Sequence, residues 1–279
     1  MRVHLLGVRG STPAPGSEFV RYGGFTSCVA IAHDDDAEPT LVLDAGTGIR
    51  RLSELLGGAA FHGTILLSHL HWDHTHGLPF FRGGDREDAR VNLFVPDQQD
   101  GSSAFAILAR GMSPPHFPIG PDELRGEWSF TNLDPGTRDF EGFEVTAVEI
   151  PHKGGRTFGY RVSDGHSTLA YMSDHCPSDL GPGPDGWGEY HQAAMSLCEG
   201  VDVLIHDASL VKEELAHEAF FGHAAAEYAV ELGRRAGVSQ VVLFHHKPDR
   251  TDEQLDAIAG RFGPEPVVLI ASESMVLQL

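Results

Sequence analysis

The sequence has few of the features that build disulfide frameworks or cross membranes. It contains three cysteines among 279 residues, and no two of them form a C-x-x-C pair. An odd number cannot pair completely, so we expect Cys28, Cys176 and Cys198 to be small buried or half-buried residues. No run of about 18 apolar residues is present, which argues against a membrane-spanning helix and a membrane partner. The first ten residues also lack the apolar run of a secretory signal, so we expect a cytoplasmic location.

Basic residues are also scarce. Lys and Arg number 20 against 40 Asp and Glu, which gives a formal net charge of −20. Lys and Arg form no cluster larger than the Arg-Arg pairs at 50–51 and 234–235. Long nucleic acids are bound by Lys and Arg that neutralise phosphates, so this balance argues against a long nucleic-acid partner. A local positive site for a small phosphate is still compatible with it.

What the sequence has instead is a series of short apolar, β-branched runs bounded by Gly, Pro or Asp, which are typical of strands. They lie at 3–8, 27–32, 40–44, 64–69, 91–96, 143–150, 158–162, 168–174, 201–207, 241–246 and 266–272. Helical periodicity is found at 48–56, 102–112, 223–237 and 252–262. The pattern predicts an α/β (α+β) fold with two mixed sheets packed face to face and helices outside. The Gly/Pro-rich stretch 176–190 is short enough for a surface loop, so residues 1–279 are expected to form a single domain.

The most informative segment is "SHLHWDHTHG" at 68–77, which follows an apolar strand. His69 and His71 are two residues apart, so both side chains point to one face of an extended segment. Asp73 and His74 come next and can point back across the turn. Neutral imidazole and carboxylate suit zinc-like ions, and two such pairs side by side suit two metals. His76 lies beyond this run and is not expected to be a ligand. The alternative is a solvated histidine-rich turn.

Because H-x-H-x-D-H after a hydrophobic strand is very specific, the chain resembles the metallo-β-lactamase-fold hydrolases from end to end. More narrowly, it resembles the branch that contains ribonuclease Z and its cyclic-nucleotide phosphodiesterase relatives. The resemblance implies a four-layer αββα sandwich with further metal ligands at later strand ends, which match His152 in "EIPHKGG", Asp174 in "YMSDH" and His245 in "LFHHKP". It also implies that Asp174 bridges two metals, one bound by His69, His71 and His152 and the other by Asp73, His74 and His245.

The expected cofactors are two divalent metal ions, Zn²⁺ first, with Mn²⁺ or Fe as alternatives. Two such ions about 3.5–4 Å apart lower the pKa of a shared water toward ~7. Together with two aspartates and a hydroxide they leave a small positive charge, which suits an anionic substrate. His246 is the alternative to His245, but it points to the opposite face if the strand stays extended.

A proton donor for the leaving group is the next requirement. The segments "VLIHDAS" and "GHAAAEYA" resemble two that flank the site in ribonuclease Z relatives, which implies that Asp207 orients His223. His223 then acts as a general acid or binds phosphate, and Asp73 is expected to be catalytic as well as a ligand. The alternative is that His223 only opens the predicted helix. The family usually has Glu in place of Asp207 and Ser-Thr in place of Ala224-Ala225, which puts the substrate in doubt more than the chemistry.

Four further segments are candidates for the surroundings of the metals. Asp44 in "LDAGTG" either orients a ligand histidine or caps a turn. The Gly-rich loops "GVRGSTPAPG" and "RYGGFTSC" would allow a close backbone approach to a ligand. "MSPPHFPIG" at 112–120 could line the substrate mouth with His116 and Phe117, or could simply pack.

The fold supports several activities, so the substrate must be inferred from other features. Ribonuclease Z grips tRNA with a basic arm, whereas the stretch 176–190 is short and has no Lys or Arg. With the acidic composition, this favours hydrolysis of a small phosphodiester, such as a cyclic nucleotide, by a metal-bound hydroxide. The alternatives are ribonuclease Z-like tRNA 3′ processing, another ester or thioester hydrolysis, and a metal-dependent sensor without activity. The complete ligand set argues against the sensor. A homodimer is possible.

Overall fold

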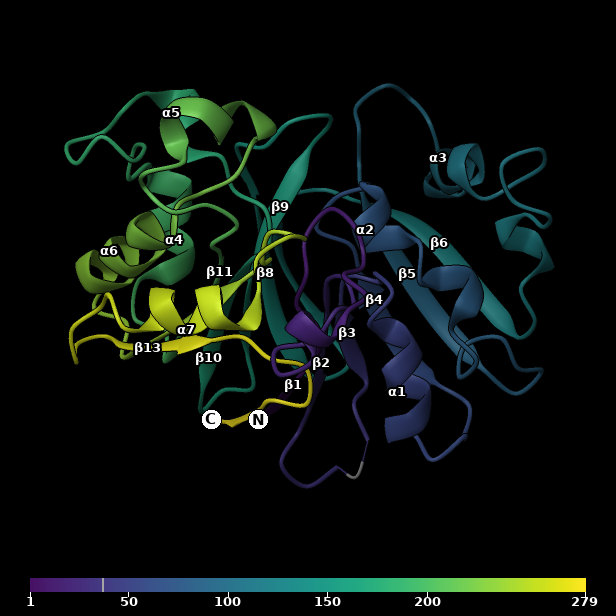
Figure 1. The fold of residues 1–279 in the computed structure, drawn as a ribbon. Coiled ribbons are helices and arrows are strands. Elements are labelled where there is room, and N and C mark those ends of the chain that lie inside the picture. The colour runs from purple at the N-terminus through teal and green to yellow at the C-terminus, as the bar shows by residue number, and fades with distance from the viewer. Residues whose placement is uncertain (37) are drawn as a thin grey trace.

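Two β-sheets of seven strands each form the centre of the molecule (Figure 1). The computed structural model describes residues 1–36 and 38–279. The first sheet has the order β14 (Val276–Gln278), β1 (Arg2–Gly7), β2 (Cys28–Ala32), β3 (Leu41–Leu43), β4 (His62–Leu66), β5 (Arg90–Pro96) and β6 (Glu127–Leu133). The second has the order β13 (Val267–Ile270), β12 (Gln240–Phe244), β11 (Val203–Asp207), β10 (Thr168–Met172), β9 (Thr157–Ser163), β8 (Phe143–Ile150) and β7 (Gly136–Phe140).

Each sheet has one parallel half and one antiparallel half. In the first sheet β3 to β6 run parallel, with Leu43 opposite Leu66 in register. In the second sheet β10 to β13 run parallel, with Met172 opposite His206. Parallel strands deliver their carboxyl ends to one edge of a sheet, and ligands of α/β proteins commonly bind there.

Helices cover the outer face of each sheet (Figure 1). On the first sheet lie α1 (Ile49–Leu55) and α3 (Ala104–Gly111), and on the second lie α4 (Gln192–Cys198), α6 (Ala226–Ala236) and α7 (Asp252–Ala259). Two shorter helices are α2 (Trp72–Thr75) and α5 (Leu215–Glu218). Single 3₁₀ turns occur at Ser17–Phe19, Leu78–Phe80, Pro121–Glu123, Pro177–Leu180 and Ala219–Phe221.

Three apolar clusters account for the four layers. The central cluster joins the two sheets, where Leu43 and Leu66 of one sheet pack with Phe158, Tyr171 and Phe244 of the other. A second cluster lies between the second sheet and its helices, and a third lies between the first sheet and its helices. The αββα sandwich predicted from the sequence is therefore confirmed. That residues 1–279 form a single domain stays a prediction.

All eleven predicted strands and all four predicted helices are present, with ends shifted by a few residues. The sequence pattern missed β6, β7 and β14, together with α2, α4 and α5. β6 and β7 are edge strands whose residues are mostly exposed or half-buried, so they carry no continuous apolar run. The three cysteines are free and buried, as predicted. Across 1–36 and 38–279, no helix is long and apolar enough to span a membrane.

Candidate metal centre

The seven side chains predicted to bind metal meet between the two sheets, at the ends of strands. They are His69 and His71 after β4, Asp73 and His74 in α2, His152 after β8, Asp174 after β10, and His245 after β12. Their ligand atoms fall into two groups, in each of which all atoms lie within 4.8 Å of one another. The turn at 68–77 and three strand ends far apart in sequence thus converge on one site.

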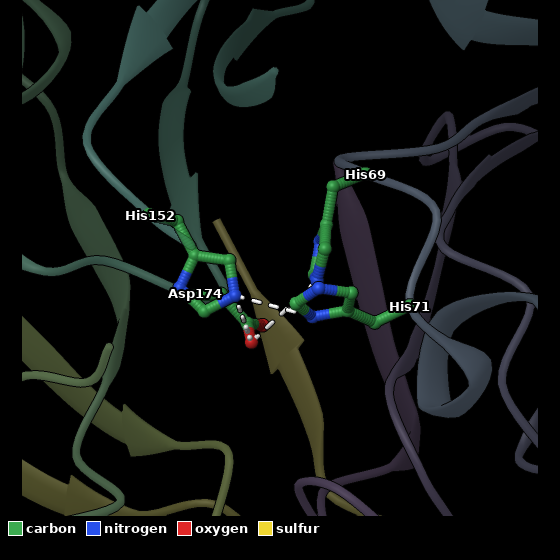
Figure 2. A group of neighbouring side chains, drawn as sticks. All are labelled: His69, His71, His152 and Asp174. Carbon is green, nitrogen blue, oxygen red and sulfur yellow. Dashed lines mark hydrogen bonds and ion pairs between the residues drawn. The ribbon is translucent and has the colours of Figure 1, made fainter. Parts of the chain in front are cut away.

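The first group consists of His69, His71 and His152 with Asp174. Figure 2 shows His152 and Asp174 facing the two histidines of the turn across the site. Nε2 of His152 lies 3.2 Å from Nδ1 of His71 and 3.5 Å from Oδ2 of Asp174. Nε2 of His69 lies 3.7 Å from the same carboxylate oxygen. Three imidazole nitrogens and one carboxylate oxygen make a donor set that a zinc-like ion prefers.

The second group consists of Asp73, His74 and His245, again with Asp174. Nε2 of His74 lies 2.9 Å from Oδ1 of Asp174 and 3.4 Å from Nε2 of His245. Nε2 of His245 lies 3.0 Å from Oδ2 of Asp73. All four side chains are buried.

Asp174 faces both groups with different oxygens. Oδ2 points to His69 and His152, whereas Oδ1 points to His74 and His245, the latter at 3.2 Å. A carboxylate placed in this way can hold one cation on each oxygen. The predicted bridging position of Asp174 therefore agrees with its geometry.

Most of the histidines are oriented by a partner on the far side of the ring. Nδ1 of His74 donates to Oδ2 of Asp44 at 2.8 Å, and Nδ1 of His152 donates to the carbonyl of Gly222 at 2.7 Å. Nδ1 of His69 lies 3.0 Å from Oγ of Ser68, which itself donates to Asp44. Each contact places the ring proton on Nδ1 and leaves Nε2 free to bind a cation.

Asp44 is the centre of this support. Its carboxylate also accepts the backbone N–H of Ser68 at 2.6 Å and the hydroxyl of Tyr171 at 2.8 Å. Of the two alternatives for Asp44, the structure shows the one in which it orients a histidine of the cluster. Ser68 and Tyr171 were not singled out in the sequence, because buried hydroxyl residues of this kind are common in any core.

The buried polar atoms fit a bound cation. Nε2 of His69 and Oδ1 of Asp174 are buried and form no hydrogen bond, and His74 approaches that oxygen outside hydrogen-bonding geometry. Buried polar atoms rarely lack a partner, so a ligand is expected at this point. The fold and its His/Asp clusters are thus suited to binding divalent metals.

Protonation of the site points the same way. Burial lowers the pKa of His69, His71 and His152, which favours their neutral, metal-binding form. Burial opposes ionisation of Asp73 and Asp174, but the neighbouring histidines outweigh it and lower the pKa of both carboxyls. For His74 burial is likewise outweighed, and Asp174, Asp73 and Asp44 raise its pKa. These three carboxylates stabilise the positive charge of a protonated His74. A bound metal ion would supply positive charge at the same place.

Backbone from the N-terminal loop closes the second group. The N–H of Ser11 donates to Oδ2 of Asp73 at 2.6 Å, and Ser11 has a left-handed φ of 61°. A Cβ at Gly10 would lie 2.3 Å from Cε1 of His245, so only glycine allows this approach. The loop "GVRGSTPAPG" therefore contacts the site, as its glycines suggested.

We expect Gly10→Ala to displace the His245 imidazole and weaken metal binding by the second group about tenfold or more. Metal content after dialysis against a graded chelator series measures this effect. Gly263→Ala is the matched control, because a Cβ at Gly263 meets no atom within 4 Å. Equal metal retention in both variants would show that Gly10 does not hold His245 in place.

The structure places His245 in the cluster and His246 outside it, through a turn and not through strand alternation. β12 ends at Phe244, and His245 has a left-handed φ of 58°. This turn directs His245 into the cluster, whereas Nε2 of His246 contacts the carbonyl of Ala271 at 2.8 Å. The predicted residue lies in the cluster, although the strand does not stay extended as far as His245.

Asp207 and His223 form a buried pair beside the metal ligands. Nδ1 of His223 donates to Oδ2 of Asp207 at 3.0 Å. Asp207 is itself held by the backbone N–H groups of His175 at 3.0 Å, Ala224 at 3.3 Å and Ser209 at 2.9 Å. Burial lowers the pKa of His223, but the charge and hydrogen bond of Asp207 outweigh it and raise that pKa to about 9. The structure thus brings the predicted pair together, and Asp207 favours the protonated form of the imidazole.

His223 does not belong to a helix. α6 begins at Ala226, so the predicted helix start at 223 was wrong by three residues. The segment before α6 is instead bent toward Asp207 by the contacts of His223 and Ala224. The alternative in which His223 merely opens the helix is therefore not what the structure shows.

His206 supports this pair from behind. Its Nδ1 donates to the carbonyl of Asp207 at 2.7 Å, and its Nε2 lies 2.9 Å from Nδ1 of the buried His175. Since a carbonyl only accepts, His206 carries its proton on Nδ1 and accepts from His175. Both rings are fully buried, and burial lowers their pKa. This pair of neutral imidazoles packs behind the strand end at Asp207.

A cavity of about 680 Å³ opens onto the metal ligands and His223. Other residues of its wall include Ser11, Trp72, Phe221 and Lys247. Nζ of Lys247 donates to Oε1 of Glu218 at 2.8 Å, and both residues line the cavity. Trp72, Phe221 and Lys247 were not predicted, since a single aromatic or lysine residue carries no signal in sequence alone.

Comparisons with known proteins agree with this geometry. Residues 40–246 match the family model described as a β-lactamase superfamily domain. Ribonuclease Z of Exiguobacterium sibiricum is 32% identical in an alignment 258 residues long that covers 77% of this chain and 82% of that protein. The metallo-β-lactamase fold protein YhfI from Bacillus subtilis aligns over 99% of both chains at 16% identity with a TM-score of 0.72. A diphosphatase from the PhnP family aligns over 100% of this chain and 97% of its own at 16% identity, with a TM-score of 0.73. The chain therefore belongs to the β-lactamase superfamily, has the metallo-β-lactamase fold and counts ribonuclease Z among its relatives.

Proposed function

We propose that this protein hydrolyses a small phosphodiester, such as a cyclic nucleotide, at a centre of two divalent metals, with zinc as the expected ion. The observation that carries the proposal is the position of Asp174, whose two oxygens face two separate groups of ligands. Five imidazoles and two carboxylates form the donor set. The names of the similar proteins, a ribonuclease and a diphosphatase, support chemistry at phosphate.

The protein's own residues supply orientation and a proton. When bound, two divalent cations activate water at neutral pH and polarise the phosphoryl oxygen under attack. His223 lines the cavity with Nδ1 fixed by Asp207, so Nε2 is the nitrogen that can donate to the leaving oxygen. Asp73, fixed by Ser11 and His245, holds its carboxylate at the cavity wall.

Charge and size favour a small substrate. A cavity of about 680 Å³ is in the range of pockets for small molecules, roughly 300–1,000 Å³. The stretch 176–190 contains only a short 3₁₀ turn at Pro177–Leu180 and has no basic residue, so it does not resemble a tRNA-binding arm. A net charge of −20 also opposes binding of a long polyanion.

A second candidate is tRNA 3′ processing of the ribonuclease Z type. It is favoured by the ribonuclease Z relative, which is 32% identical over most of both chains. The two candidates share the metal centre and the proposed proton donor, so they differ in what binds outside the catalytic cavity.

The test is one substrate panel with metal-loaded protein. It comprises bis-p-nitrophenyl phosphate, 2′,3′- and 3′,5′-cyclic nucleotides, a precursor tRNA and a thioester. We expect hydrolysis of bis-p-nitrophenyl phosphate and of at least one cyclic nucleotide, with the tRNA left intact. Cleavage of the tRNA with untouched cyclic nucleotides would replace the first candidate by the second, and thioester cleavage alone would contradict both.

A further inference from the structure

A second cavity of about 490 Å³ lies next to the metal cavity. Leu70 and Trp72 line both, so the two cavities share a wall. Its other sides are formed by the segment that follows α2, by α3 and by the predicted mouth segment, including Phe80, Ile107 and Phe117. Nothing in the proposed chemistry uses this space.

Trp72 is the most unusual residue of the shared wall. Trp72 stands between the predicted ligands His71 and Asp73 in the sequence, yet the residue is 70% exposed to solvent. Its ring stacks on that of His76, with centroids 5.1 Å apart and planes 22° from parallel. A large aromatic ring left in water beside a reactive centre is available to stack on a bound group.

The walls of the second cavity are aromatic and aliphatic. Phe80, itself 54% exposed, meets Phe117 edge to face with centroids 5.8 Å apart. Ile107 and Met112 add buried apolar surface below them. This composition suits a flat, apolar ring more than a hydrated group.

The charges of the second cavity are equally selective. Among the described residues that line it, none is Asp or Glu, although the chain contains 40 acids. Its ionisable residues are His76, His116 and Arg110, the last paired with Asp100 outside the cavity. Binding of a cationic group in this cavity is therefore disfavoured, whereas the cavity can hold a neutral ring that is part of an anionic substrate.

We propose that the second cavity binds an aromatic ring, such as a nucleobase, of the phosphodiester whose phosphate lies at the metal centre, with Trp72 as the stacking platform. This inference rests on the proposed function and specifies its substrate class. Stacking of a base on an aromatic side chain is sequence-tolerant, so the platform selects for a ring and not for one particular base. Trp72 would then be a specificity-determining residue of the site.

Two variants test this without altering a predicted metal ligand. Trp72→Ala removes the platform. Gly111→Phe places a ring at the end of α3, at a residue that lines the cavity and where an added Cβ meets no atom within 4 Å, and is intended to obstruct the cavity. Gly263→Phe is the matched control, since Gly263 is equally unobstructed and does not line the cavity. Metal content and the thermal unfolding midpoint show whether each variant is intact, and Gly111→Phe carries the test if Trp72→Ala does not fold.

The readout is binding to metal-loaded protein, measured by calorimetry with AMP and ribose 5-phosphate. We expect AMP to bind about tenfold or more tightly than ribose 5-phosphate in the unmodified protein and in Gly263→Phe. Both cavity variants should lose this preference while keeping their affinity for ribose 5-phosphate. Hydrolysis of bis-p-nitrophenyl phosphate is followed on the same samples, so that loss of the proposed function is seen separately.

Equal affinity for AMP and ribose 5-phosphate in the unmodified protein would overturn the inference. A preference for AMP that persists in both cavity variants would do the same. n-Hexyl phosphate tests for an alkyl occupant. If its affinity exceeds that of ribose 5-phosphate by as much as the affinity of AMP does, the cavity accepts an alkyl chain and the ring proposal is wrong. Because binding needs no turnover, each of these outcomes is decisive even for a protein that fails to hydrolyse the panel.

Discussion

Asp174→Ala is expected to lower kcat/KM for bis-p-nitrophenyl phosphate by about 10³-fold or more, roughly 4 kcal/mol of transition-state stabilisation. The carboxylate is buried and faces both ligand groups, so its loss removes one donor from each. It also leaves His69, His74 and His245 without their shared counter-charge. We therefore expect the variant to retain less than its full complement of metal.

The control for Asp174 is Asp252→Ala, which also removes a buried carboxylate. Asp252 accepts the backbone N–H groups of Arg21 and Tyr22 and lies in none of the His/Asp ligand groups. Its loss should lower stability but not metal content per folded molecule. Asp174→Asn, which keeps the side-chain shape, separates folding from charge if the alanine variant is unstable. An Asp174→Ala protein with full activity and two bound metals would refute the two-metal mechanism.

His223→Ala is expected to have an effect that depends on the leaving group. For a cyclic nucleotide, whose leaving oxygen needs a proton, kcat should fall by about 10²–10⁴-fold. For bis-p-nitrophenyl phosphate, whose leaving group departs as a stable anion, the loss should be only a few-fold. If His223 only binds phosphate, the substitution should instead lower the rate of hydrolysis of both substrates by a similar factor.

The pH profile gives the same prediction an independent readout. Asp207 outweighs burial and raises the pKa of His223 to about 9, so the imidazole keeps its proton through neutral pH. The rate for a cyclic nucleotide should therefore fall as the pH rises through the pKa of His223, and this alkaline limb should be absent in His223→Ala. Asp207→Asn should move the limb to lower pH. His62→Ala, at an exposed histidine of β4, should leave the profile unchanged.

The residues that the structure brings together were easier to predict from the sequence than the contacts around them. Four of the donors stand together in one short motif, at His69, His71, Asp73 and His74. The later three, His152, Asp174 and His245, were implied by the resemblance to the metallo-β-lactamase-fold hydrolases and lie after strand-like runs. Strand ends are readable from sequence because apolar runs stop where the chain leaves the core. The parallel halves of the two sheets are what bring these strand ends together in space.

What sequence could not supply are contacts made by backbone or by unremarkable residues. The Ser11 N–H reaches Asp73 only because the loop adopts a left-handed conformation, and Tyr171 reaches Asp44 across the sheet interface. His245 reaches the cluster through a left-handed turn that strand periodicity does not predict. The edge strand β7 escaped detection because only Phe140 within it is buried. Trp72 belongs to no hydrophobic pattern of a strand or helix in the sequence, although it lines both cavities in the structure.

The most direct measurement of the central claim is anomalous diffraction at the zinc edge from crystals grown with zinc. Two peaks are expected, one among His69, His71 and His152 and the other among Asp73, His74 and His245. Asp174 should lie within bonding distance of both, about 2.0–2.2 Å for a carboxylate oxygen. A single peak, or two peaks of which neither contacts Asp174, would contradict that claim.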